Sequence, residues 1–224
     1  MPTEPDPRTA TRPPGAWRAS IRIVALGASG SLGLLAVGGA PGREAATLVW
    51  LGLWAMPAGY LAGRLVSVPG LLAALAVTVM ATLPTLLGLP HPFIGWISVA
   101  GLYLWGAGLA RRSSTGGWSG AGALLLIVGV ASALPSAGGI LAQPWPPAWT
   151  VILLDLSPIV WVVESAGLDW MRHPAVYERA GTGDLGPEMR VAWAGVGGPL
   201  LLLFLSGPLL DTGPGRWTRI RIKK

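Results

Sequence analysis

Long apolar runs separated by short polar or basic turns fill most of the first 141 residues, and one more lies near the carboxyl end. Each is about twenty residues long, the length that an α-helix needs to cross roughly 30 Å of hydrocarbon. They predict membrane spans at residues 21–40, 45–62, 69–89, 93–110, 120–141 and 191–210. A buried helix of a soluble protein could explain one such run, but not six. The pattern therefore predicts an all-α, polytopic membrane protein with about six transmembrane helices.

Residues 150–165 are also apolar, but charges and a proline interrupt them. Ser157 followed by Pro158 is typical of a helix start, because serine caps the first backbone N–H groups and proline suits the first turn. Gly167 is typical of a helix end. A helix over 158–166 would be about 13 Å long, which is too short to cross a membrane alone.

Pro174 and Gly181 bracket a second short helix, at residues 175–180. Two such helices predict a broken or re-entrant pair before the last span. The predicted organisation is a disordered cytoplasmic tail (1–20), a five-helix membrane bundle (21–141), an exoplasmic or re-entrant segment (142–190), a last transmembrane helix (191–210) and a basic cytoplasmic tail (211–224).

The distribution of basic residues bears on whether 150–165 crosses the membrane, because cytoplasmic loops carry an excess of Arg and Lys. With the amino terminus inside, a crossing segment leaves ten basic residues in the cytoplasm and six outside. A segment that does not cross leaves twelve inside and four outside. The second arrangement is favoured. It predicts a multi-pass protein of the cell membrane with both termini in the cytoplasm.

Composition excludes several function classes. Charged residues make up 12% of the chain, against about 25% in soluble domains. The absence of cysteine excludes disulfides, thiolate catalysis and Cys-ligated metals. The net charge of +6 comes from short basic groups at the ends of apolar runs, so it indicates topology rather than a nucleic-acid partner. No nucleotide-binding fingerprint is present, and we predict no cofactor.

Acidic residues are absent between positions 44 and 155, and six of the ten then fall between 155 and 188. Ionisable groups near hydrocarbon tend to mark function. The candidate functional polar residues are Asp155, Glu164, Asp169, Arg172 and His173. Asp155 and Glu164 could handle protons or cations, or they could lie near the interface at the ends of short helices. The other three form either a site or a salt-bridged loop, and no metal site is predicted.

Small residues predict where helices approach one another closely. The first predicted span carries Gly27, Gly30 and Gly33, and the second carries Gly59 and Gly63 at GxxxG spacing. We expect these glycines to form helix-packing faces.

Six spans with broken exoplasmic helices before the last one resemble the permease subunits of ABC-2-type exporters. The stretch from Leu156-Ser157-Pro158 to Glu164 lies where such permeases often carry a Ser/Asn-Pro…Glu segment. The resemblance implies a transport function, a separate ATPase, and either other membrane subunits or a second copy as partners in the lipid bilayer. The short loop at 64–69 offers little surface for an ATPase.

Two alternatives to transport remain open. The first is a non-catalytic assembly or scaffold subunit of a larger membrane complex. The second is a membrane enzyme that acts on a lipid-linked substrate through Asp169 and His173.

Overall fold

The structure is a computed structural model that describes residues 16–32, 43–114, 116–137 and 156–168. Throughout these residues the regular elements are helices, which confirms the all-α prediction for this part of the chain. In chain order they are α1 (Ala16–Gly30), α3 (Arg43–Leu65), α4 (Val68–Leu86), α5 (Pro92–Arg112), α6 (Gly117–Ala137) and α8 (Pro158–Ser165).

The helices α3, α4 and α5 are long and apolar enough to cross a membrane, judged by length and composition. They are consistent with an integral membrane protein. The predicted last span (191–210) and the second short helix (175–180) lie outside the described residues. The count of six spans and the re-entrant pair therefore remain predictions.

Helix boundaries differ from the predicted spans: α4 ends at Leu86, three residues before the predicted end, whereas α1 and α3 extend further than predicted. α1 begins at Ala16, five residues before the predicted start, and α3 includes Arg43, Glu44 and Arg64. Charged residues end an apolar run without ending a helix, because Arg and Glu are good helix formers. Their long side chains can also reach the membrane surface from the last turn of a span.

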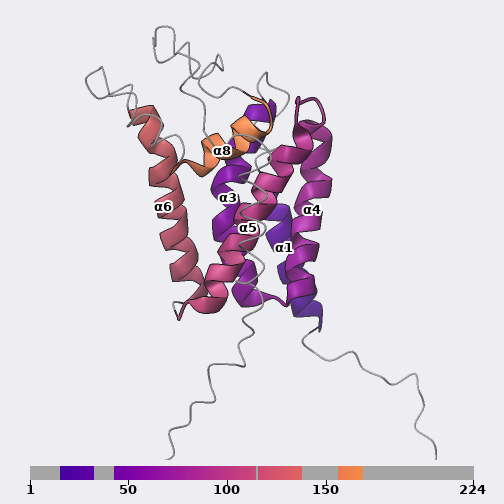
Figure 1. Cartoon of the computed structure of the whole chain (residues 1–224). Helices are drawn as coiled ribbons and strands as arrows, with labels where there is room; N and C mark the ends of the chain where they lie inside the picture. Colours follow the sequence, from indigo (N-terminus) through magenta and orange to yellow (C-terminus); the bar gives the residue numbers. More distant parts are fainter. Residues whose placement is uncertain (1–15, 33–42, 115, 138–155, 169–224) are drawn as a thin grey trace, which may run out of the picture.

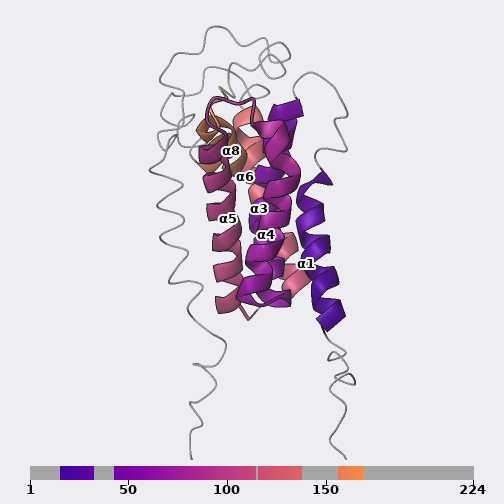
Figure 2. The ribbon, with the colours of Figure 1, turned by 90° about the vertical axis from the view of Figure 1, so that its right-hand side faces the viewer.

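α3 is the central helix of the bundle. Each of the other described helices packs against it. In its most apolar 18-residue window 72% is buried, against 28% in α4. Successive helices from α3 to α6 run antiparallel through short turns (Figure 1). α1 and α4 lie side by side on one flank of α3, and α6 lies on the opposite flank (Figures 1 and 2).

Glycine brings the backbones of α3 and α5 together. A Cβ atom at Gly59 would lie 3.0 Å from Tyr103 Cα and still closer to its carbonyl oxygen. In return, a Cβ atom at Gly106 would lie 3.1 Å from Met56 Cα. Only a hydrogen atom fits at these two positions, so the GxxxG glycine Gly59 lies directly in the α3–α5 contact.

Aromatic and polar side chains connect four helices in the middle of the bundle. Trp54 of α3 and Tyr103 of α5 stack with ring centroids 5.4 Å apart and planes at 18°. Trp54 Nε1 donates to Ser29 Oγ of α1 at 2.8 Å, and the Tyr103 hydroxyl donates to the Leu71 carbonyl of α4 at 3.4 Å. Thr78 Oγ1 lies 2.9 Å from a carbonyl oxygen of α1. This network fixes α1, α3, α4 and α5 relative to one another.

The two ends of the bundle differ in charge. At the end where α3 and α5 finish, five basic residues gather: Arg18, Arg22, Arg64, Arg111 and Arg112. We call this the arginine end. The two acidic residues in the described part of the chain, Glu44 and Glu164, belong to the opposite end, together with Arg43.

Candidate functional site

The short helix α8 starts and stops at the residues that the sequence predicts. Ser157 Oγ accepts a hydrogen bond from the Val160 N–H at 3.3 Å, and Pro158 occupies the first helical position. Gly167 adopts a φ of 87°, which is typical of glycine after a helix end. The prediction of a helix at this place is therefore confirmed.

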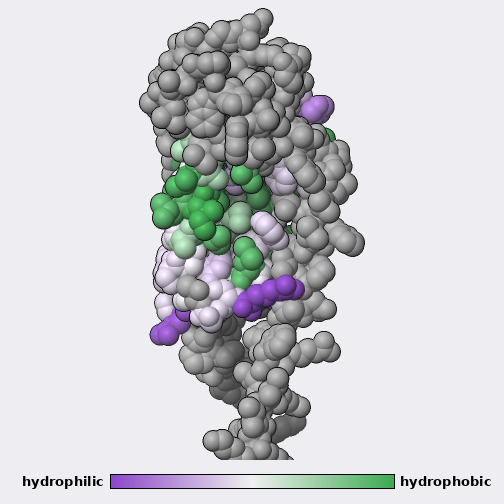
Figure 3. Space-filling view, turned by 60° about the vertical axis from the view of Figure 1, so that its left-hand side comes forward, coloured by the Kyte–Doolittle hydropathy of each residue, from purple (hydrophilic) through white to green (hydrophobic). Residues whose placement is uncertain are grey.

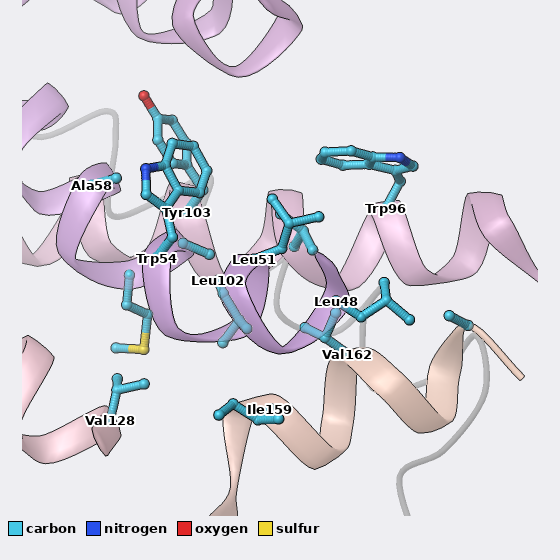
Figure 4. Close-up of a cluster of buried hydrophobic side chains, with 14 of the residues drawn as sticks. Leu48, Leu51, Trp54, Ala58, Trp96, Leu102, Tyr103, Val128, Ile159 and Val162 are labelled. Atoms are coloured by element: carbon cyan, nitrogen blue, oxygen red, sulfur yellow. The ribbon is translucent and has the colours of Figure 1, made fainter. Parts of the chain in front are cut away.

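α8 is buried in the bundle rather than lying on its surface. Its side chains Ile159 and Val162 are 7% and 0% exposed. They pack toward Leu48 and Leu51 of α3, with Val128 of α6 also close by (Figure 4). An eight-residue helix gains little stability by itself, so this packing holds α8 in the helical state.

The beginning of α8 lies deep between the longer helices. A Cβ atom at Gly52 would lie 2.9 Å from Ile159 Cα. Gly52 is the tenth residue of α3, which places it about 14 Å from the start of that helix. The end of α8 lies near the start of α5, where the His91 N–H donates to the Ala166 carbonyl at 3.0 Å. α8 thus rises from the interior of the bundle to one end of it (Figure 1).

A pair of buried serines connects α8 to α5. Ser165 Oγ and Ser98 Oγ lie 2.7 Å apart. Each also lies within hydrogen-bonding distance of a carbonyl in its own helix, Ile94 for Ser98 at 3.2 Å and Val162 for Ser165 at 3.1 Å. One hydroxyl hydrogen can join the two serines while the other points to a carbonyl. The pair is thereby a structural link, and its arrangement is not that of an activated nucleophile.

Of the predicted polar site residues, the structure describes Glu164. This side chain is half-buried in the last turn of α8, beside Ser165 and away from the deep start of the helix. Whether Glu164 handles protons or cations, or lies near the interface at the end of a short helix, remains a prediction. Asp155, Asp169, Arg172 and His173 lie outside the described residues, so their roles remain predictions.

The structure brings His91 close to the end of α8. A Cβ atom at Gly167 would lie 3.1 Å from His91 Cδ2. No group of three His, Asp or Glu residues that could hold a metal is found within the described ranges.

Sequence reasoning missed the two linked serines. Ser98 follows Gly95 by three residues in an apolar run, so the two share one helix face. A small residue and a hydroxyl on one face indicate close helix contact in a membrane. That signal could have marked the α5 side of the contact, but nothing in the sequence identifies Ser165, 67 residues away, as the partner.

The predicted packing glycines have different surroundings. Gly27 of α1 faces α4, where an added Cβ would lie 2.7 Å from Val77 Cβ, and Gly63 of α3 faces α5, where it would lie 2.6 Å from the Ala107 carbonyl oxygen. An added Cβ at Gly30 would meet side chains of both α4 and α3. Gly33 lies outside the described residues.

In comparisons with known proteins, no family model, no curated protein and no solved structure matches this chain.

Proposed function

We propose that the chain is a permease-like membrane subunit that works with partner proteins. The observation that supports this most is α8, a short apolar helix that begins in the interior of the bundle and ends near its surface. Transport proteins commonly use discontinuous helices whose ends lie beside the substrate or ion pathway. A helix break at membrane depth is tolerated where protein or a water-filled cavity surrounds the backbone.

In this proposal the arginine end faces the cytoplasm, as the positive-inside rule expects. The α8 end then faces the exoplasm, and both termini are cytoplasmic in the six-span arrangement. A separate ATPase would bind on the cytoplasmic side, and a second copy or another membrane subunit would complete the assembly. Asp155, two residues before the Ser157 cap, is the first candidate for an ion-handling group, and Glu164 is the second.

A scaffold subunit is the second candidate function. The close α3–α5 contact and the four-helix network around Trp54 would suit a rigid anchor for other subunits. The two functions differ in one measurable property. A permease must admit water to the start of α8 in at least one state, whereas a scaffold has no such need.

Two single cysteines test this difference in a chain that has no cysteine of its own. Leu156→Cys lies two residues before α8, and Ile127→Cys lies on the outer face of α6. Their native side chains are 60% and 62% exposed. Ile127 is the middle residue of α6, about 15 Å from either end. Gly52, which lies beside Ile159, is about 14 Å from the start of α3, so the two probes lie at similar depth. A water-soluble maleimide reacts with the hydrated thiolate.

In native membranes we expect the cysteine at 156 to react at least about tenfold faster than the cysteine at 127, because a thiol in hydrocarbon stays protonated. Adding ATP should change the rate at 156 and leave the rate at 127 unchanged. Equal and slow labelling at both positions, with and without ATP, would reject the permease and favour the scaffold.

The enzyme hypothesis needs a separate test, because it depends on other residues. His173→Ala and Asp169→Asn would abolish turnover of a lipid-linked substrate if those side chains carry the chemistry. They would leave ATP-dependent labelling at position 156 unchanged.

A further inference from the structure

Three arginines lie at the turn between α5 and α6. Arg64, from the last turn of α3, donates from Nη2 to the Ser113 carbonyl. Its Cβ and Cγ atoms lie 3.7 and 3.8 Å from where a Cβ would sit at Gly117, the first residue of α6. Arg111 and Arg112 end α5 immediately before this turn. Three arginines from two helix ends thus lie next to one short turn, and the Arg64 guanidinium contacts its backbone.

The charge at this end stays positive even when acidic neighbours are counted. In the part of the chain that the structure describes, this end carries the five residues of the arginine end, and both acidic residues lie at the opposite end. A phosphate carried by a lipid is the anion that such a surface meets in a membrane.

An apolar surface begins next to the arginines. Trp118, in the first turn of α6, is 76% exposed, and Leu126, two turns further along, is 69% exposed. Figure 3 shows this arrangement as a hydrophobic area on the α6 flank with hydrophilic side chains at the arginine end below it. Tryptophan at such a boundary suits the headgroup level of a bilayer. From the arginines toward Leu126, charged, tryptophan and apolar side chains follow one another in space. This order matches the headgroup, interfacial and acyl-chain layers of a bilayer leaflet.

We infer that the α5–α6 turn binds the headgroup of an anionic phospholipid, held by Arg64, Arg111 and Arg112, with the acyl chains lying along the exposed face of α6. Guanidinium groups bind phosphate oxygens through paired hydrogen bonds, which gives them an advantage over a simple point charge. The assignment to the cytoplasmic leaflet rests on the proposed orientation. The binding itself does not, and it is independent of whether the chain transports anything.

The test uses the purified full chain in neutral detergent, titrated with phosphatidylglycerol or phosphatidylcholine and followed by native mass spectrometry of lipid adducts. We expect tighter binding of phosphatidylglycerol. The dissociation constant for phosphatidylglycerol should rise about fivefold in each of three variants, Arg64→Gln, Arg111→Gln and Arg112→Gln. This is the effect of losing one basic residue near an anionic surface. Arg112→Lys should change it less than Arg112→Gln, because the charge remains.

Arg43→Gln is the matched control, because Arg43 begins α3 at the opposite end of the bundle. We expect it to leave the dissociation constant within about twofold, a difference of less than 0.5 kcal/mol. Far-UV circular dichroism of each variant establishes that the helices remain folded.

Three results would overturn the inference. One is equal affinity for the two lipids. Another is a loss with Arg43→Gln as large as the loss with Arg112→Gln. The third is displacement of phosphatidylglycerol by inorganic phosphate at equal concentration, which would show a site for a free anion rather than for a lipid. None of these results bears on the ATP-dependent labelling that tests the permease proposal.

Discussion

At the scale of single residues, two buried tryptophans of the same apolar cluster differ in hydrogen bonding. Trp54 and Trp96 are each 6% exposed and belong to the same apolar cluster. Trp54 Nε1 donates to Ser29 Oγ. Trp96 Nε1 is buried without a hydrogen-bond partner in the part of the chain that the structure describes. A buried donor without an acceptor is unfavourable, so the two indoles should respond differently to the loss of the N–H group.

Trp54→Phe should destabilise the protein more than Trp96→Phe, by at least about 1 kcal/mol, because it loses a hydrogen bond whereas Trp96→Phe removes an unpaired buried donor. Both substitutions remove a similar apolar volume, and phenylalanine at position 54 keeps a ring beside Tyr103, so packing losses largely cancel in the comparison. Thermal unfolding in detergent, followed by circular dichroism, measures the difference. Equal destabilisation would mean that the Trp54–Ser29 bond contributes nothing.

At the scale of helices, the sequence predicts that a helix exists, and its approximate length, better than it predicts which other helices the helix contacts. A run of twenty apolar residues forms a helix whatever it packs against, because every backbone group in lipid needs an internal hydrogen bond. α8 was also predictable, since Ser157, Pro158 and Gly167 give local start and stop signals. Which glycine meets which backbone depends on tertiary packing, and glycines occur 33 times in this chain.

Gly59→Ala should therefore separate α3 from α5 and cost about 1 to 3 kcal/mol, the usual range for overpacking. The added methyl group would collide with the Tyr103 backbone, which cannot move without shifting α5.

Gly122→Ala is the matched control, because nothing lies within 4 Å of a Cβ at that position of α6. It should be neutral or slightly stabilising, since alanine favours helix over glycine by up to about 1 kcal/mol. The same thermal unfolding experiment compares the two. A Gly59→Ala protein as stable as Gly122→Ala would show that the backbones are not in contact.

At the scale of the whole molecule, the two ends of the bundle differ in charge, and this difference predicts the orientation of the bundle in the membrane. All five arginines of the arginine end lie opposite the two acidic residues that the structure describes. The sequence alone predicts this asymmetry through the positive-inside rule. It does not predict that α3 is central, because α3 and α5 are similar in length and apolar character and differ in what surrounds them.

Single cysteines at two turns test which end of the bundle faces which side of the membrane. Ser114→Cys lies between α5 and α6 at the arginine end, and Gly88→Cys lies between α4 and α5 at the opposite end. With an impermeant maleimide on sealed, right-side-out vesicles, we expect labelling at position 88 and none at 114. Inverted vesicles should give the opposite pattern. Labelling of both positions from one side would contradict an antiparallel crossing by α5.

The place of α8 in the chain has a consequence for biosynthesis. Its niche is built by α3 and α5, which leave the ribosome well before α8 does. Until residues 156–168 are made, Leu48, Leu51 and Gly52 face an unfilled space beside Ser98. The described bundle is therefore completed only after α3, α4, α5 and α6 have been made, and a product truncated before Pro158 lacks the side chains that cover Leu48 and Leu51.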